Sequence, residues 1–188
     1  GTGWRVGDVA TSLVVDAAGA WADVVAERAG VPRLGLQPYR RTIAVARVPD
    51  RARLRGAMVC EALDRFYYKI EGDDLLVSPA DETPTEPGDA RPDELDVAIA
   101  LERVEEATGL GLRSIRTSWA GLRSFVPDRR PVVGSWPDHP GFGFVAGQGG
   151  SGIETAPALA AFAAAVLTGA PPPADVPLEP AALAPTRR

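Results

Sequence analysis

The chain has 188 residues, which is enough for one domain of ordinary size or one and a half. Its apolar fraction of 45% and charged fraction of 24% are typical of folded domains and exclude a disordered chain, collagen and a coiled coil. With a net charge of -5, the chain lacks the excess of basic residues typical of a nucleic-acid-binding protein, so no nucleic-acid partner is expected.

Membrane and cysteine signals are both weak. The longest apolar run, 156–167, is shorter than the about 20 residues that a membrane-spanning helix needs, so no membrane span is expected. The single cysteine, Cys60, excludes an internal disulfide and a thiolate zinc site. It indicates a reducing compartment, and a cytoplasmic location is the expectation.

The first half of the chain predicts a strand, a helix and then a meander. Residues 12–18 are typical of a buried strand, and 20–29 have the apolar spacing of a helix. Short β-like stretches follow at 37–49, 57–63, 65–71 and 73–78. After a loop at 80–91, a helix is predicted over 92–108, starting at Pro92 and ending at Gly109.

The second half predicts further strands, a glycine loop and a last helix. The strands are expected at 113–119, 123–126, 131–135 and 143–146. The helix is expected from 153 to 167, ending at Gly169, and the proline-rich residues 171–188 should be extended or clamped. The pattern as a whole favours an α+β fold with a mainly antiparallel sheet and flanking helices.

The glycine loop between the last strand and helix matches a known spacing. Gly147, Gly149 and Gly152 satisfy G-x-G-x-x-G, the fingerprint of dinucleotide binding. A Rossmann fingerprint opens a βαβ unit, whereas here the helix runs into a proline-rich tail, so we reject that interpretation. Two explanations remain: a tight strand-to-helix turn, or a ligand approaching the positive end of the helix dipole.

Three polar residues on predicted strands are candidates for binding. Strand alternation predicts that Arg40, on the side of Thr42, and Tyr67 both leave the apolar faces of their strands. Solvation alone would also explain either residue. Arg123 is a charge within an apolar stretch, and its guanidinium suits either the Asp128 carboxylate or a ligand carboxylate.

Other chemistries have little support. The one histidine, His139, lies in a predicted turn without a serine or cysteine nucleophile motif nearby, so a triad hydrolase is not indicated. The acidic residues between 81 and 89 are typical of a solvated loop. No metal is assigned.

Six blocks in order resemble the flavin-dependent amino acid oxidase and dehydrogenase family, which includes D-amino acid oxidase, glycine oxidase and sarcosine oxidase. They are VVDAAGAW at 14–21, LQPYRR at 36–41, FYYK at 66–69, LLVSPA at 75–80, SWAGLRSFV at 118–126 and AGQGGSGI at 146–153. Within the family they resemble D-arginine dehydrogenase most. The likeness is to the carboxyl-terminal half, so the resemblance implies a missing amino-terminal FAD-binding half as a partner.

The resemblance also implies the site residues and the cofactor, FAD. Arg40, Tyr67 and Arg123 match positions that hold the carboxylate of an amino acid substrate, and Gly150 matches a backbone contact to its amino group. The residues implied to contact the flavin are Gly147, Gly149, Gly150, Ser151, Gly152, Ile153 and Thr155. The helix dipole would stabilise negative charge on the flavin, and no side chain is expected to act as a catalytic base.

The implied organisation and function follow from this match. Residues 1–35 would be carboxyl-terminal elements of an α/β FAD-binding domain, 36–118 the substrate domain, 119–170 the flavin-contacting part and 171–188 a tail. The expected reaction is oxidation of D-amino acids, including basic ones such as D-arginine, to imino acids by hydride transfer to flavin N5. A glycine- or sarcosine-type oxidase, and a flavin-free fragment or interaction domain, are the alternatives. By the resemblance, Ser151 stands where close relatives can have an aromatic residue, and the acidic residue for a cationic side chain would come from the absent half, so the substrate is left open.

Overall fold

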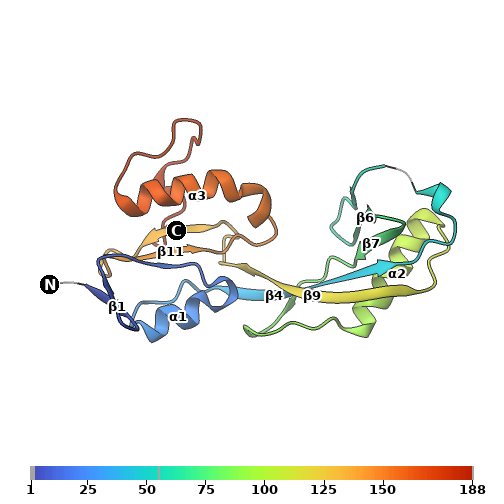
Figure 1. Ribbon diagram of the computed structural model, residues 1–188, viewed down its shortest axis with the longest axis horizontal. Coiled ribbons are helices and arrows are strands. Elements are labelled where there is room, and N and C mark those ends of the chain that lie inside the picture. The colour runs from blue at the N-terminus through green and yellow to red at the C-terminus, as the bar shows by residue number, and fades with distance from the viewer. Residues whose placement is uncertain (1–2, 55, 188) are drawn as a thin grey trace. The chain divides into compact units, whose positions relative to one another are not determined.

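The computed structural model describes residues 3–54 and 56–187, which form two compact units. Unit 1 comprises Gly1–Pro38 and Arg123–Arg188, and unit 2 comprises Tyr39–Leu122. The chain passes between the units along two strands, β4 (Gln37–Ala46) and β9 (Ile115–Phe125) (Figure 1). Residues 1–2 and 188, at the ends of the first and last predicted segments, lie outside the described residues.

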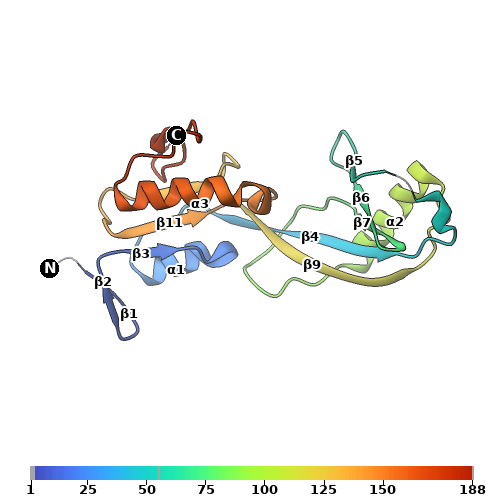
Figure 2. The same ribbon diagram turned by 45° about the horizontal axis from the view of Figure 1, so that its top comes forward.

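Unit 1 contains a three-stranded sheet in the order β10-β11-β3. Its elements are β1 (Trp4–Val6), β2 (Val9–Thr11), β3 (Val14–Asp16), η1 (Gly19–Trp21), α1 (Ala22–Arg28), β10 (Val132–Ser135), β11 (Phe142–Ala146), α3 (Gly152–Thr168) and η3 (Pro180–Ala182). Strands β10 and β11 are antiparallel, whereas β11 and β3 are parallel. Helices α1 and α3 lie on opposite sides of this sheet (Figures 1 and 2).

The unit 1 sheet is covered on both faces, so its strands point apolar side chains to both sides. Val133 packs with Phe162 of α3, while Phe144 packs with Ala26 of α1. The tail joins this core: Leu183 is buried, and its carbonyl accepts a hydrogen bond from Val133 N at 2.8 Å. The expectation of a clamped tail is therefore confirmed.

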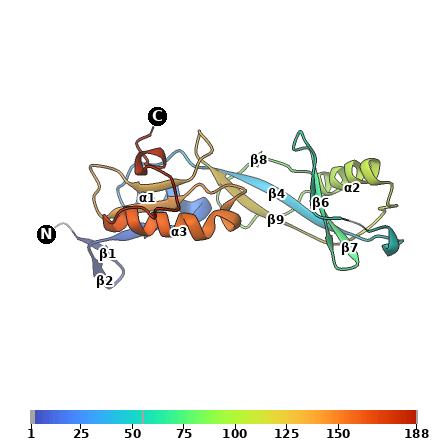
Figure 3. The same cartoon turned by 90° about the horizontal axis from the view of Figure 1, so that it is seen from above.

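Unit 2 contains a six-stranded sheet in the order β5-β6-β7-β4-β8, with β9 also paired to β4. Its further elements are η2 (Arg51–Arg53), β5 (Val59–Cys60), β6 (Tyr67–Glu71), β7 (Asp74–Ser78), β8 (Thr83–Pro84) and α2 (Glu94–Thr108). Helix α2 packs against β7, and its Val97, Ala100 and Val104 join the core with Ala44 and Val77 of the sheet (Figure 3). The α+β fold with a mainly antiparallel sheet is confirmed.

The helix boundaries follow capping chemistry. Helix α2 begins at Glu94 rather than Pro92, because the Asp93 carboxylate caps it by accepting from Leu95 N at 2.9 Å. It ends at Gly109, whose φ of 59° is the left-handed conformation typical of a helix end.

Two strand predictions were wrong. The expected strands at 113–119 and 123–126 are one continuous strand, β9, which pairs with β4. Of the expected strand at 57–63, only β5 (Val59–Cys60) is extended, and both of its residues are exposed.

Candidate functional site

The glycine loop of unit 1 joins β11 to α3 and is fixed to strand β9. Gly147 and Gly149 have φ values of 72° and 56°, a region that favours glycine. Gly149 N donates to the Ser124 carbonyl at 3.1 Å, which holds the loop against the end of β9. The backbone itself therefore requires glycine at two of the fingerprint positions.

Close packing explains why side chains are also absent at Gly149 and Gly150. A Cβ on Gly149 would overlap the ring of Phe125. A Cβ on Gly150 would lie 2.9 Å from Nη1 of Arg123, so any side chain there would displace the guanidinium. The structure thus brings together Arg123 and Gly150, two of the four residues predicted to bind the substrate.

Phe125 also contacts a second arginine of unit 1. The guanidinium carbon of Arg129 lies 3.7 Å from the centroid of the Phe125 ring, a cation–π distance. Phe125 is therefore held between the glycine loop and a cation. This packing limits the movement of the strand end that carries Arg123.

The N-terminus of α3 presents backbone amides. The first amides of a helix have no intrahelical acceptor, and the Ser151 side chain does not cap this helix. Thr155 Oγ1 turns back and donates to the Ser151 carbonyl at 2.7 Å, while Ile153 is 95% exposed. The positive end of a 17-residue helix is thus available to a negatively polarised group.

Asp128, one of the two partners considered for Arg123, anchors the tail. Its carboxylate accepts from Arg187 Nε at 2.8 Å and Nη2 at 2.9 Å, and from Arg130 N at 3.1 Å. The Arg187 hydrogen bond, followed by those of Arg130, holds the pKa of Asp128 well below its usual range. This carboxylate is therefore committed to two other arginines.

Tyr67 in unit 2 points away from the core, as predicted. Its neighbour Tyr68 pairs with Val77 and packs against the core under α2, so alternation turns Tyr67 to the opposite face. On that face, the guanidinium carbon of Arg41 lies 6.0 Å from the Tyr67 ring centroid. Arg41 Nε also donates to the Asp81 carbonyl at 2.7 Å.

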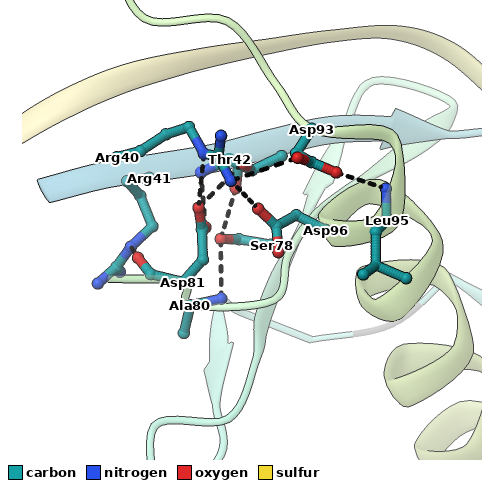
Figure 4. A network of polar contacts seen from close by, with 9 residues as sticks. All are labelled: Arg40, Arg41, Thr42, Ser78, Ala80, Asp81, Asp93, Leu95 and Asp96. Atoms are coloured by element: carbon teal, nitrogen blue, oxygen red, sulfur yellow. Dashed lines mark hydrogen bonds and ion pairs between the residues drawn. The ribbon is translucent and has the colours of Figure 1, made fainter. Parts of the chain in front are cut away.

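Arg40 lies on the α2 face of the same sheet, and the prediction that it leaves the apolar face was wrong. Thr42, on its side of β4, is fully buried because α2 covers this face. Arg40 Nη2 lies 2.6 Å from Asp96 Oδ2 and 3.8 Å from Asp93 Oδ2, and Nε lies 3.7 Å from Asp81 Oδ2 (Figure 4). Three carboxylates therefore surround the Arg40 side chain.

The structure thus places Arg40 and Tyr67 on opposite faces of one sheet. Sequence reasoning missed Arg41, which shares the face of Tyr67. The Arg40-Arg41 doublet was the available signal, because consecutive strand residues always point to opposite faces.

The mixed sheets and the glycine loop at a helix N-terminus, with the adjoining arginine, are the features to set beside known proteins. Residues 1–166 match the family model described as DAO, FAD dependent oxidoreductase. The chain belongs to this family, whose members are FAD-dependent flavoproteins.

Known proteins align with this chain over most of its length. FAD-dependent oxidoreductase domain-containing protein 1 of Bos taurus is 28% identical over 170 residues, covering 80% of this chain and 34% of the relative. L-proline dehydrogenase from P. horikoshii superposes with a TM-score of 0.79 at 21% identity, covering 98% of this chain and 49% of that one. Glycine oxidase from Geobacillus kaustophilus gives 0.76 at 24% identity, covering 95% and 46%.

The likenesses cover only part of each known protein, at low sequence identity. The chain spans about a third of the length of the bovine relative, at 34%, and about half of the two solved structures, at 49% and 46%. At these identities the solved structures show the fold.

Among residues 3–54 and 56–187, no helix is both long and apolar enough to cross a membrane.

The residues of the glycine loop fit a flavin. The amides at the start of α3 suit an electron-rich carbonyl of the ring. The exposed Ile153 offers an apolar contact beside these amides. Gly147 to Thr155 could therefore hold the cofactor on the unit 1 side.

Proposed function

We propose that this chain is the substrate-domain portion of an FAD-dependent oxidoreductase that oxidises D-amino acids, basic ones such as D-arginine included, to imino acids. The observation that carries the proposal is the approach of Arg123 Nη1 to Gly150 in the loop before α3. A guanidinium beside a backbone at a helix N-terminus offers complementary partners to the carboxylate and the amino group of an amino acid.

Each proposed role follows from the chemistry of the group. Arg123 would bind the substrate carboxylate through two parallel hydrogen bonds, and the Gly150 carbonyl would accept from the amino group. FAD, when bound, supplies the hydride acceptor at N5. The amides of the α3 N-terminus would stabilise the negative charge that hydride transfer creates, without having to reorient.

The unit 2 candidates separate into two roles. Tyr67 remains a proposed substrate contact, and Arg41 joins it because both lie on one face of the sheet. Arg40 is matched by the resemblance to carboxylate binding, yet its ion pair with Asp96 at 2.6 Å favours a second role. In that role it fixes the start of α2 to β4.

A glycine- or sarcosine-type oxidase is the second candidate. The small Ser151 and the likeness to glycine oxidase from Geobacillus kaustophilus favour it. Because the chain spans about half of that structure, at 46%, a flavin-free fragment that lacks its partner half is the further alternative. A cytoplasmic location, proposed from the single cysteine, is part of the proposal in each case.

The test is anaerobic reduction of the flavin in the complete protein that contains this chain. D-arginine, L-arginine, glycine and sarcosine are mixed in turn with the oxidised protein, and loss of the visible flavin absorbance is followed. Fast reduction by D-arginine alone supports the proposal, and fast reduction by glycine or sarcosine supports the second candidate. Absence of flavin after purification with added FAD would contradict both.

A second measurement separates a dehydrogenase from an oxidase. After reduction, air is admitted, and the return of the flavin absorbance is timed against the turnover rate. Return as fast as turnover indicates an oxidase. Slow return indicates a dehydrogenase that uses another electron acceptor.

A further inference from the structure

Four arginines gather around one hollow of unit 2, where β4 ends and β9 begins. The hollow has a volume of about 390 Å³, and Arg47, Arg51, Arg113 and Arg116 contribute to its lining. All four side chains belong to exposed residues. In a chain with a net charge of -5, this grouping is not a consequence of general basicity.

Positive charge exceeds negative charge at this hollow. Arg116 Nε pairs with Asp74 Oδ2 at 2.6 Å, and Arg51 Nη1 pairs with Asp73 Oδ2 at 2.6 Å. Within the described part of the chain, no carboxylate lies within ion-pair distance of Arg47 or Arg113. Two guanidinium groups are therefore left without a counter-charge.

The neighbouring Asp50 does not supply this counter-charge. Its Oδ1 accepts from Ala52 N at 3.1 Å, which caps the short helix η2. Asp50 is not among the residues that line the hollow.

The backbone around the hollow is fixed by buried and local contacts. Glu105 Oε2 accepts from both Gly111 N and Leu112 N at 2.8 Å, which holds the turn that leads to Arg113. Gly111 has a φ of 80°, and a Cβ there would lie 3.6 Å from Pro49 Cγ. Arg47 N donates to the Ser114 carbonyl at 2.9 Å, so the backbone segments that carry Arg47 and Arg113 are joined.

We propose that this hollow binds a compact, multiply charged oxyanion of the phosphate class, such as a diphosphate or a phosphate ester. Guanidinium groups match phosphate oxygens with paired, charge-assisted hydrogen bonds. The volume of about 390 Å³ is within the range of small-ligand sites, about 300 to 1,000 Å³. The two unbalanced charges match the charge of one phosphate group, and the fixed backbone lowers the cost of ordering the site on binding.

The test uses the full chain and inorganic diphosphate as the probe, titrated by calorimetry at low ionic strength. The variant Arg47→Ala/Arg113→Ala removes the two unbalanced charges. The control Arg28→Ala/Arg91→Ala removes the same charge from exposed residues elsewhere. Because each double variant changes exposed residues, thermal unfolding without ligand should be unchanged in both.

The expected result is one diphosphate bound per chain, with binding weakened by about tenfold or more in Arg47→Ala/Arg113→Ala, because hydrogen bonds to a charged group are lost. The control should bind almost as the parent does. Equal weakening in both double variants would show general electrostatic attraction and overturn the proposal, as would no binding by the parent chain. Citrate binding as tightly as diphosphate would overturn the phosphate assignment.

Discussion

Arg40 and Tyr67 lie on opposite faces of the unit 2 sheet, although the sequence resemblance predicted that both bind the substrate carboxylate. Arg40 faces α2, where it pairs with Asp96 at 2.6 Å. Tyr67 faces away from the core and lies beside Arg41. The face of Arg40 therefore packs against α2, and the face of Tyr67 is the one proposed for the substrate.

Replacing Arg40 should cost stability before it costs substrate binding. In Arg40→Ala, the partly buried carboxylates of Asp81 and Asp96 lose their counter-charge, and we expect a loss of about 2 kcal/mol, below the range for fully buried pairs because Arg40 is partly exposed. Denaturant unfolding measures this loss. Arg41→Ala is the matched variant, and it should affect substrate KM more than stability. A stable Arg40→Ala protein with a raised KM would return Arg40 to the substrate-binding set.

Replacing Arg123 should weaken substrate binding. In the complete enzyme, Arg123→Ala is expected to cost about 2 to 5 kcal/mol of amino acid binding, since one partner of a hydrogen-bonded charge pair is removed. Arg123→Lys keeps the charge but loses the paired geometry, so it should fall between Ala and the parent. Steady-state KM and flavin reduction at varied substrate report the effect. An unchanged substrate affinity in Arg123→Ala would exclude the assignment.

The two glycines Gly149 and Gly30 form a matched pair for testing the loop. Both have positive φ, 56° and 69°, but a Cβ on Gly149 overlaps Phe125, whereas nothing lies within 4 Å of a Cβ on Gly30. Gly30→Ala should lose about 1 kcal/mol of stability from backbone strain. Gly149→Ala should lose about 2 to 4 kcal/mol, since steric overlap adds to that strain. Thermal unfolding compares them, and equal losses would mean that Phe125 moves aside freely.

Unit 1 should become less stable in acid, because the contribution of the Asp128–Arg187 pair is lost there. The pKa of Asp128 is lower in the folded chain than in the unfolded chain, so the unfolded state binds more protons as pH falls. The contribution is complete above the unfolded pKa of about 4 and is lost as pH falls below it. We expect about 1 kcal/mol, because Asp128 is 35% exposed. Arg187→Ala should reduce this pH dependence, because only the hydrogen bonds of Arg130 then remain, and Asp138→Asn, at an exposed residue, should leave it unchanged.

Asp16 should act in the opposite direction. It is 3% exposed, its Oδ1 accepts from Ala18 N, and its Oδ2 has no hydrogen-bond partner among the described residues. Burial raises the pKa of Asp16, so stability falls as pH rises from the unfolded pKa through the folded one. Asp16→Asn keeps the acceptor for Ala18 and should be more stable than the parent at pH 7. Equal pH profiles of unfolding for the two proteins would contradict this.

Local patterns predicted most of the elements, because each has a local cause. Gly109 and Gly169 end helices through left-handed conformations, and the Tyr67 side followed from simple alternation. The start of α2 was predicted at Pro92, two residues too early, because the Asp93 side chain caps the helix. Residues 120–122 were left outside the predicted strands, although β9 runs through them.

Tertiary contacts decided what local patterns could not. Alternation gave the sides of β4 correctly but not which side α2 would cover, so the partly buried position of Arg40 beside the carboxylates was missed. The commitment of Asp128 to Arg187 joins residues 59 positions apart and has no sequence signal. The contact of Arg123 with Gly150 was accessible only through the family resemblance.

The doublet in β4 has a consequence for strand register. A slip of one residue that brought Arg41 to the carboxylates would put Thr42, not an arginine, beside Tyr67. The same slip would force Val45 and Arg47 into the places of Ala44 and Ala46, which are buried beneath α2, so the small size of these two alanines opposes it. Small side chains beneath a helix therefore determine which arginine is offered to a ligand.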